Sequence, residues 1–435
     1  MFDKKNKSLI YPKDIWKKYP IKNVLIDNLS HLLTINMAIV ADFKELNYST
    51  ASPLFKNQFD KVVFRSIAHS VTDYKIDTSK IIKRFMNIKY DFHSDNVKMP
   101  NFHQKGDYKA VVPLSCGKDS IMTLAVCNEL GLKPVCVYIN DTISPPENKI
   151  KMDFIDQVSE RFGNKVIKVI NEIEQLNDFE TWDAEESTLP YMHMITGFCF
   201  ISLPITNYFN ARYIVIGNQQ NMNFSFMNKD GYSTFPSYDQ TDEWQKQQSI
   251  MTKMMTNGTV SVLSVIKPLT NIAIMKILFN RYKEYTKFLI CCDCLDISRE
   301  KRWCHDCNKC ARLQLMIKAV SKNVSEGEEH LERVGFHTNL LQKKYLKHYC
   351  LFDGKEVDCY EKSKGARDEQ LLSFYLAYKK GFKGALMDLF EKKFLKEARA
   401  REDELMKKFF KIYEADIPRE FKSELFKIYR DGLGE

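Results

Sequence analysis

The hydrophobic residues between positions 109 and 217 follow two alternating patterns along the chain. Short apolar runs predict buried strands, and the longer stretches between them, with apolar residues at helical spacing, predict helices. The strand-like runs are 111–114, 134–139, 166–170 and 213–217, and the helical stretches are 121–130, 152–162 and 191–209. Strands that alternate with helices predict an α/β fold, in which a doubly wound parallel sheet is covered by helices on both faces.

The pattern changes on both sides of this segment. Residues 1–105 carry apolar runs but no catalytic motif, and we expect an N-terminal accessory domain there. The C-terminal part is mostly helical in pattern, with amphipathic stretches at 371–378 and 409–413, and predicts a helical extension. The predicted domains are 1–105, 106–290, a cysteine-rich element at 291–320, and 321–435.

Length and composition favour a soluble globular protein, because the chain has 435 residues, of which 44% are hydrophobic and 28% are charged. The formal net charge is +9, from 65 basic and 56 acidic side chains. This excess suits anionic substrates such as nucleotides. It is too small to favour a nucleic-acid partner by itself.

The sequence predicts a cytoplasmic protein without a membrane partner. The charged N-terminal residues have no apolar segment behind them, so no signal peptide is expected. The longest apolar run, 194–205, is shorter than a membrane span and contains Pro204. In a reducing compartment the 12 cysteines are not expected to form a disulfide framework, and those that cluster point to a metal.

The strand at 111–114 runs directly into the polar segment Ser115-Cys116-Gly117-Lys118-Asp119-Ser120, and a helix follows. Such a junction directs backbone N–H groups and the positive end of a helix at one point, which suits a phosphate. Gly117 lets the backbone approach an anion, Lys118 adds positive charge, and the carboxylate of Asp119 could hold Mg²⁺. Ser115 and Ser120 add hydroxyl donors. The alternative is a surface turn of the same composition, and the flanking strand and helix favour nucleotide binding over it.

A cysteine cluster lies about 175 residues further along the chain. Cys304, Cys307 and Cys310 form a C-x-x-C-x-x-C pattern, and further cysteines lie just upstream. Four thiolates predict a closed structural Zn²⁺ site, with an iron–sulfur cluster as the alternative. We favour Cys292 as the fourth ligand. The neighbouring Cys291 and Cys294 stay open as alternatives, and His305 is expected to be a neighbour and not a ligand.

The segment from Ser115 to Ser120 closely resembles the S-G-G-K-D-S signature of the PP-loop ATP pyrophosphatase superfamily, whose fold is HUP-like. Cys116 stands where that family usually has glycine. The cysteine pattern resembles the zinc site of the 7-cyano-7-deazaguanine synthases. A longer resemblance, over 109–315, is to the ATP-dependent UDP-N-acetylmuramoyl-L-alanyl-L-glutamate epimerases. The matching pieces are the 115–120 segment, a helix led by His193, and the segments 215–218, 239–244, 264–269 and 302–310.

These resemblances imply an enzyme that binds ATP and Mg²⁺ and transfers AMP to a substrate carboxylate with release of pyrophosphate. Residues 115–120 would bind the nucleotide together with Gly217 and Asn218, and Lys118 and Asp119 would act in catalysis. The epimerase resemblance implies a peptide-like cell-wall precursor as the substrate. The synthase resemblance implies nucleobase or tRNA modification as the alternative. A non-catalytic nucleotide-binding scaffold is a third alternative, and the intact Lys118-Asp119-Ser120 argues against it.

Proton transfer after adenylation would need a base, and the candidates are His193, Asp239 and Glu243. Each has a plain structural alternative, as a core histidine or as a capping or solvated carboxylate. Lys267 could contact a phosphate or a substrate carboxylate, or it could be a surface lysine. The epimerases have a glutamate where this chain has Gln219, and this difference bears on metal binding or proton transfer.

Overall fold

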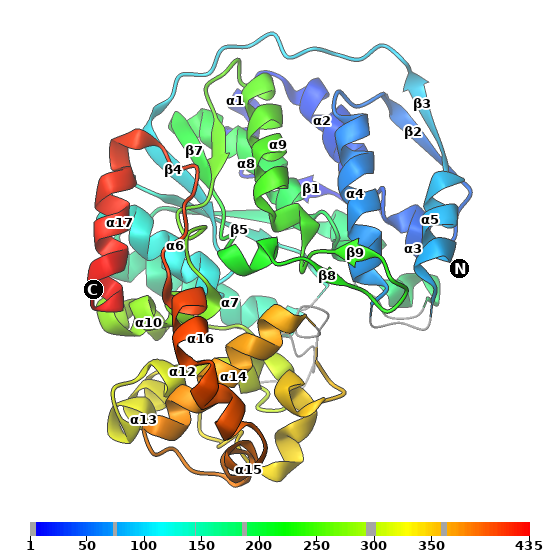
Figure 1. Cartoon of the computed structure of the whole chain (residues 1–435). Coiled ribbons are helices and arrows are strands. Elements are labelled where there is room, and N and C mark those ends of the chain that lie inside the picture. Colours follow the sequence, from blue (N-terminus) through cyan, green and yellow to red (C-terminus); the bar gives the residue numbers. More distant parts are fainter. Residues whose placement is uncertain (1–5, 73–75, 144, 185–188, 293–301, 358–362) are drawn as a thin grey trace.

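A six-stranded sheet forms the centre of the molecule (Figure 1). The computed structural model describes residues 6–72, 76–143, 145–184, 189–292, 302–357 and 363–435. The strand order is β1-β6-β5-β4-β7-β10; β1 pairs antiparallel with β6, and the other neighbours are parallel. The strands are β1 (Leu9–Ile10), β4 (Asp107–Pro113), β5 (Val135–Asn140), β6 (Val166–Asn171), β7 (Ala211–Val215) and β10 (Ser261–Leu263). The predicted α/β class with a mostly parallel sheet is therefore confirmed.

The chain winds in both directions from β4. It passes through α6 (Lys118–Glu129) and α7 (Pro145–Phe162) to reach β5 and β6, and then crosses to β7 on the other side of β4. Residues of α6 and α7 share one hydrophobic core with Val112 and Val215. The helices α8 (Met194–Phe209) and α9 (Asp242–Met255) share the opposite core with Val111 and Ile214. Both faces of the sheet are therefore covered by helices, because successive side chains of a strand point to opposite faces.

The N-terminal residues pack against the α8 side of the sheet. Phe55 and Phe59 both lie edge-to-face against Phe200 of α8, with ring centroids 5.8 Å and 5.4 Å away. The N-terminal segment also contributes β1 to the edge of the sheet. Its other elements are α1 (Lys13–Lys18), α2 (Lys22–Leu32), α3 (Met37–Val40), α4 (Lys56–Ser70), α5 (Thr78–Met86) and the parallel pair β2 (Glu45–Ala51) and β3 (Lys89–Ser94).

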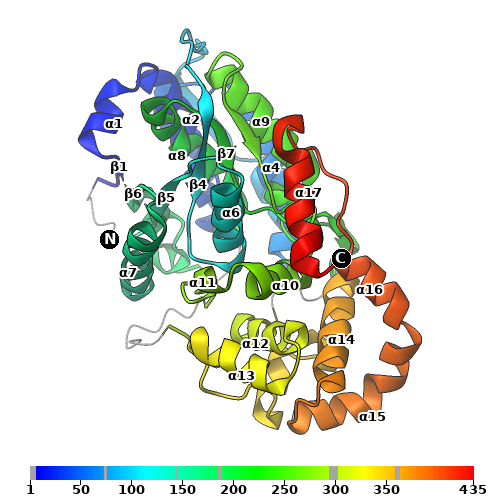
Figure 2. The ribbon, with the colours of Figure 1, turned by 90° about the vertical axis from the view of Figure 1, so that its left-hand side faces the viewer.

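The C-terminal helices continue the core on the α6 side of the sheet. Figure 2 shows α12 to α16 grouped beneath α10 and α11, whereas α17 lies higher, near α10 and the sheet. Gly432 of α17 lies so close to α10 that an added Cβ would stand 2.8 Å from Ile277. The helices are α10 (Asn271–Arg281), α11 (Lys283–Thr286), α12 (Asn308–Val320), α13 (Val324–Arg333), α14 (Lys364–Lys379), α15 (Ala385–Ala400), α16 (Glu402–Phe410) and α17 (Arg419–Leu433).

The remaining elements are short. They are the hairpin strands β8 (Phe226–Met227) and β9 (Ser233–Thr234) and the 3₁₀ helices η1 (Glu172–Leu176), η2 (Phe179–Trp182), η3 (Leu189–Tyr191), η4 (Gln220–Asn223), η5 (Tyr238–Gln240), η6 (Lys343–His348) and η7 (Cys350–Phe352).

Two features of the fold differ from the pattern along the sequence. The expected helical stretch at 409–413 is wrong beyond Phe410, where α16 ends. There the backbone N–H of Tyr413 donates to the carbonyl of Pro268 at 2.9 Å, so a tertiary contact replaces helical pairing. The strands β1, β2 and β3 of the N-terminal segment were not predicted, and β1, with two residues, is too short to show a period.

One segment of the described residues, Lys22–Val40, has the length and apolar character of a membrane-crossing helix. Within the fold, 72% of its most apolar window is buried, and its residues belong to the core on the α8 side. The core helix of a globular protein has the same properties, so the segment is weak evidence for a membrane.

Candidate functional site

A cavity of about 280 Å³ opens at the carboxyl ends of β4, β5 and β7. Ser115, Asp119 and Ser120 line it after β4, and Gly217 and Asn218 line it after β7. These two strands are neighbours in the sheet, but the chain leaves them for opposite faces. Such a reversal of strand order leaves a crevice between the two loops, which is where open α/β sheets bind their ligands.

The 115–120 loop is a tight turn. Cys116 has a φ of +60°, the left-handed conformation that glycine adopts without strain, at a cost of about 1 kcal/mol for other residues. The Cys116 side chain is fully buried in the core, and burial raises the pKa of its thiol to about 12. The Ser115 N–H donates to Ser120 Oγ at 3.3 Å, and this hydroxyl donates to the Gly117 carbonyl at 3.1 Å. The backbone of Cys116 therefore takes a turn that glycine favours, while its thiol packs into the core.

Lys118 and Asp119 form an ion pair at the start of α6. Lys118 Nζ lies 2.7 Å from both carboxylate oxygens of Asp119. The Lys118 side chain is buried, whereas Asp119 lines the cavity. The loop therefore offers the cavity a carboxylate whose charge is balanced by a lysine directly behind it.

The loop after β7 packs tightly against α6. A Cβ added to Gly217 would stand 3.1 Å from the Cβ of Asp119, so glycine permits this approach. Asn218 is 2% exposed, and neither polar atom of its side chain has a hydrogen-bond partner among the described residues. An unpaired buried amide costs about 1–3 kcal/mol, so a cavity ligand or water would satisfy it. Gln219 instead turns away and donates to Asn271 at 2.6 Å.

Two of the predicted bases are held in structural hydrogen bonds. The His193 ring is buried, with its Nδ1 2.6 Å from the amide nitrogen of Asn36, and burial lowers its pKa to about 4. The carboxylate of Asp239 accepts from the N–H groups of Ile195 at 2.7 Å and Thr196 at 3.2 Å, so it caps the start of α8. Burial raises the pKa of Asp239 to about 6. In the described part of the chain, neither side chain lines the cavity.

Glu243 and Lys267 also lie apart from the described lining of the cavity. Glu243 accepts from Lys61 at 3.0 Å and from Tyr238 at 2.9 Å on the outer side of α9, and both hydrogen bonds, Lys61 first, lower its pKa. Lys267 is buried, and its Nζ lies 3.1 Å from Asp242 Oδ1. Lys267 is therefore not a surface lysine.

Several lining residues were missed in the sequence. Asp141 and Asn148 are joined by a hydrogen bond of 3.2 Å, Lys151 lines the cavity from α7, and Gln240 lines it from η5. Asp141 follows the carboxyl end of β5, and the rule that identified Ser115 and Gly217 would have identified it too. Lys151 and Gln240 carry no such signal, because α7 and η5 reach the cavity only through tertiary packing.

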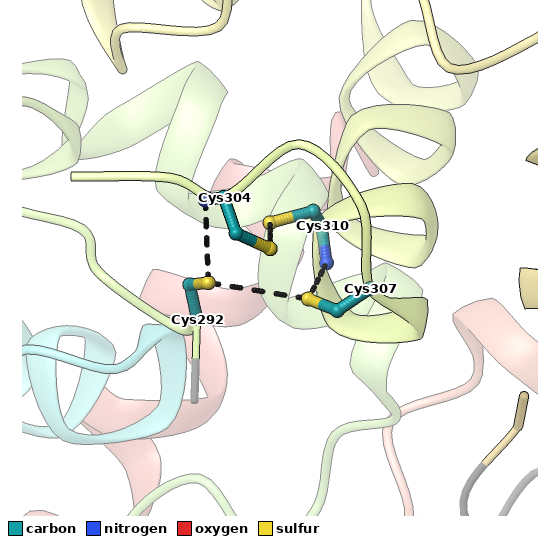
Figure 3. A group of neighbouring side chains, drawn as sticks. All are labelled: Cys292, Cys304, Cys307 and Cys310. Atoms are coloured by element: carbon teal, nitrogen blue, oxygen red, sulfur yellow. Dashed lines mark hydrogen bonds between the residues drawn. The ribbon is translucent and has the colours of Figure 1, made fainter. Parts of the chain in front are cut away.

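A second site is formed by four cysteines, shown in Figure 3. The sulfurs of Cys292, Cys304, Cys307 and Cys310 all lie within 4.8 Å of one another, and we call these residues the four-cysteine group. The four-cysteine group could hold a metal ion such as zinc, because four thiolates at this spacing suit a tetrahedral ion. Nearby cysteine sulfurs, that of Cys292 first, raise the pKa of both Cys307 and Cys310. A bound cation would offset this crowding of negative charge.

The choice of Cys292 from the upstream cysteines agrees with this grouping. Cys291 lies outside it and accepts a hydrogen bond from the backbone N–H of Lys118 at 3.3 Å. Cys294 lies outside the described residues. His305 also lies outside the group, and its Nε2 is 3.5 Å from the backbone nitrogen of His337.

Comparison with known proteins adds no evidence on what this protein does. No protein-family model matches the chain, and no curated protein matches it either.

Proposed function

We propose that this protein is a PP-loop enzyme that binds Mg²⁺·ATP at the 115–120 loop and transfers AMP to a substrate carboxylate. The observation that carries the proposal is the cavity at the reversal of strand order, lined by Ser115, Asp119 and Ser120 on one side and by Gly217 and Asn218 on the other. Polyphosphates bind at such strand–loop–helix junctions, where N–H groups and a helix N-terminus converge.

In this proposal a substrate carboxylate oxygen attacks the α-phosphorus of ATP, the bond to the bridging oxygen breaks, and pyrophosphate leaves. Mg²⁺ would be held by Asp119 and would stabilise the charge that develops on the leaving group. Lys118, which pairs with Asp119, would then be free to face phosphate oxygens. The unpaired amide of Asn218 would bind a polar group of the nucleotide or of the acceptor.

The acceptor that we propose is a carboxylate on a peptide-like cell-wall precursor, supported by the order of the matching segments along the chain. If the adenylate then loses its α-proton, the described carboxylates that line the cavity, Asp119 and Asp141, lie closer to the reaction than the buried His193. Zinc would be held by the four-cysteine group, as a structural centre outside this chemistry.

The first test is the nucleotide product. The protein with ATP, Mg²⁺ and a panel of peptide-like acids should release AMP and pyrophosphate in equal amounts. The variant Lys118→Ala should lose at least about a hundredfold in rate, as expected for loss of one stabilising charge. Lys149→Ala, at an exposed position on α7, is the matched control and should keep full activity.

Formation of ADP and phosphate would refute the proposed chemistry, and full activity of Lys118→Ala would remove the loop from the mechanism. A deazapurine carboxylic acid belongs in the same panel, because AMP formation with that acid alone would favour nucleobase modification. If the reaction is run in deuterated water, incorporation of deuterium at the α-carbon of a peptide acceptor would indicate epimerisation.

A further inference from the structure

Three consecutive residues connect the four-cysteine group to the 115–120 loop. The N–H of Ile290 donates to the carbonyl of Cys116 at 2.8 Å. The sulfur of Cys291 accepts from the N–H of Lys118 at 3.3 Å. Cys292 belongs to the four-cysteine group. Residues 290–292, here called the clamp segment, therefore contact the loop through two residues and supply the third to the four-cysteine group.

Arg302 and Cys304, at the start of the C-x-x-C-x-x-C pattern, contact the clamp segment and the residues just before it. Arg302 donates to the carbonyl of Leu289 and, at 3.3 Å, to that of Thr286, just before the clamp segment. Two residues later, the N–H of Cys304 donates to the sulfur of Cys292 at 3.4 Å. The clamp segment and the residues just before it therefore contact both Cys304 and the arginine two positions ahead of it.

The loop needs outside support because of Cys116. Its left-handed backbone is strained in a residue with a side chain, and glycine would relieve that strain. The hydrogen bond from Ile290 falls on the carbonyl of this residue, and the one to Cys291 falls on the first helical residue of α6. The clamp segment therefore contacts the strained residue itself and the residue two positions later, where α6 begins.

We propose that the four-cysteine group, when it holds its metal, stabilises the 115–120 loop through the clamp segment, with Cys291 as a positioning residue. Metal occupancy then sets the affinity of the loop for a polyphosphate. The choice of a polyphosphate as the ligand rests on the proposed function. The contact between the four-cysteine group and the 115–120 loop does not depend on it. A metal joins Cys292 to Cys304, Cys307 and Cys310, whereas free thiols make only weak contacts with one another.

The first experiment leaves the metal in place. Cys291→Ala should keep the zinc content of the purified protein, exchange amide hydrogens at 115–121 faster, and bind Mg²⁺·pyrophosphate about three- to tenfold more weakly, the range for one lost hydrogen bond. Cys291→Ser keeps an acceptor and should recover most of the affinity. The control is Cys350→Ala, at another half-buried cysteine outside the four-cysteine group, and it should behave as wild type.

The second experiment removes the metal from wild type with a zinc-selective chelator. Pyrophosphate should bind more weakly, with faster exchange at 115–121 and unchanged exchange at 89–94 in the remote strand β3. In Cys116→Gly the strain is relieved, so chelation should weaken binding by a smaller factor than in wild type.

The clamp would be overturned if Cys291→Ala and wild type showed the same amide exchange at 115–121 and the same affinity for pyrophosphate. It would also be overturned if wild type kept its exchange rate and its affinity after chelation. If metal-loaded wild type binds no pyrophosphate, the proposed function fails. The exchange measurements still decide the clamp in that case, because they need no ligand.

Discussion

His193 shows how burial decides the role of a titratable side chain. Its ring lies in the core beside Asn36, and burial lowers its pKa to about 4, so it is neutral at physiological pH. Asp239 caps α8 and is shifted in the opposite direction, to a pKa of about 6. At this scale the surroundings of a residue, and not its type, separate the core groups from Asp119 and Asp141, which line the cavity.

The pKa of His193 predicts a dependence of stability on pH. In the unfolded chain His193 takes up a proton as the pH falls below its ordinary pKa of 6.5. In the folded chain it takes up that proton only near pH 4. The free energy of unfolding should therefore fall by up to about 3 kcal/mol between pH 6.5 and 4 through this residue. Urea denaturation at about pH 7.5 and about pH 5 should show a smaller fall in His193→Gln than in wild type.

The comparison between variant and wild type is needed because Asp239 acts in the opposite sense. Its raised pKa makes the folded chain bind a proton first, which adds stability as the pH falls from about 6 to 3.8. That contribution is present in both proteins and cancels in the difference. An equal fall in wild type and in His193→Gln would contradict the assignment of His193 as a buried neutral group.

Among the elements, α14 supports the cavity from a distance. Its buried Glu369 accepts from the N–H of Ile272 at 3.1 Å and from the amide of Asn271 at 3.2 Å, at the first turn of α10. The same carboxylate accepts from Asn221 at 3.1 Å, in the 3₁₀ helix that follows the Gly217–Asn218 loop. A carboxylate at a helix N-terminus is favourable, and here it also joins three segments far apart in sequence.

Replacement of Glu369 should therefore loosen both α10 and the loop after β7. Glu369→Gln should lower the free energy of unfolding by about 1–3 kcal/mol, because its neutral amide cannot accept all of these bonds. Glu332→Gln, at an exposed site on α13, is the matched control and should change stability by less than about 0.5 kcal/mol. Urea denaturation of both variants is the measurement, and equal midpoints would contradict the role of Glu369.

In the whole molecule, the helices beyond residue 320 share a continuous core with the sheet. That core joins Val112 and Met122 to Leu371, Phe409 and Tyr429. The hydroxyl of Tyr429 also donates to the carbonyl of Val265, next to β10. The C-terminal region therefore covers one side of the sheet and of α10, and the apolar surface beneath it would otherwise face water.

A chain truncated after residue 320 should consequently be insoluble or fail to unfold cooperatively. Co-expression of 321–435 as a separate chain should restore a soluble complex, since the contacts are non-covalent packing and hydrogen bonds. Size-exclusion chromatography and thermal melts by circular dichroism test both expectations. A truncated chain that is monodisperse and melts cooperatively would show that the sheet does not need this cover.

Much of the fold could be predicted from the sequence because its strongest signals are local. The apolar runs that became β4, β5, β6 and β7 are short and bounded by polar turns, and α6 and α7 are the longer stretches between them. The spacing of Cys304, Cys307 and Cys310 brings these three sulfurs together through one turn and the start of α12. Such signals depend on only a few neighbouring residues, so they can be recognised in the sequence without the tertiary structure.

The rest depended on contacts between distant segments. The cavity is formed by loops that meet only because β7 lies beside β4, and Lys151 and Gln240 reach it from α7 and η5. The choice between neighbouring cysteines was settled in space, where Cys292 joins the four-cysteine group and Cys291 contacts Lys118. Periodicity and spacing are local properties, so the α/β class, the polar 115–120 segment and the cysteine cluster could be predicted without the structure. Which side chains face the cavity could not be predicted, because burial and hydrogen-bond partners arise from packing between residues far apart in the chain.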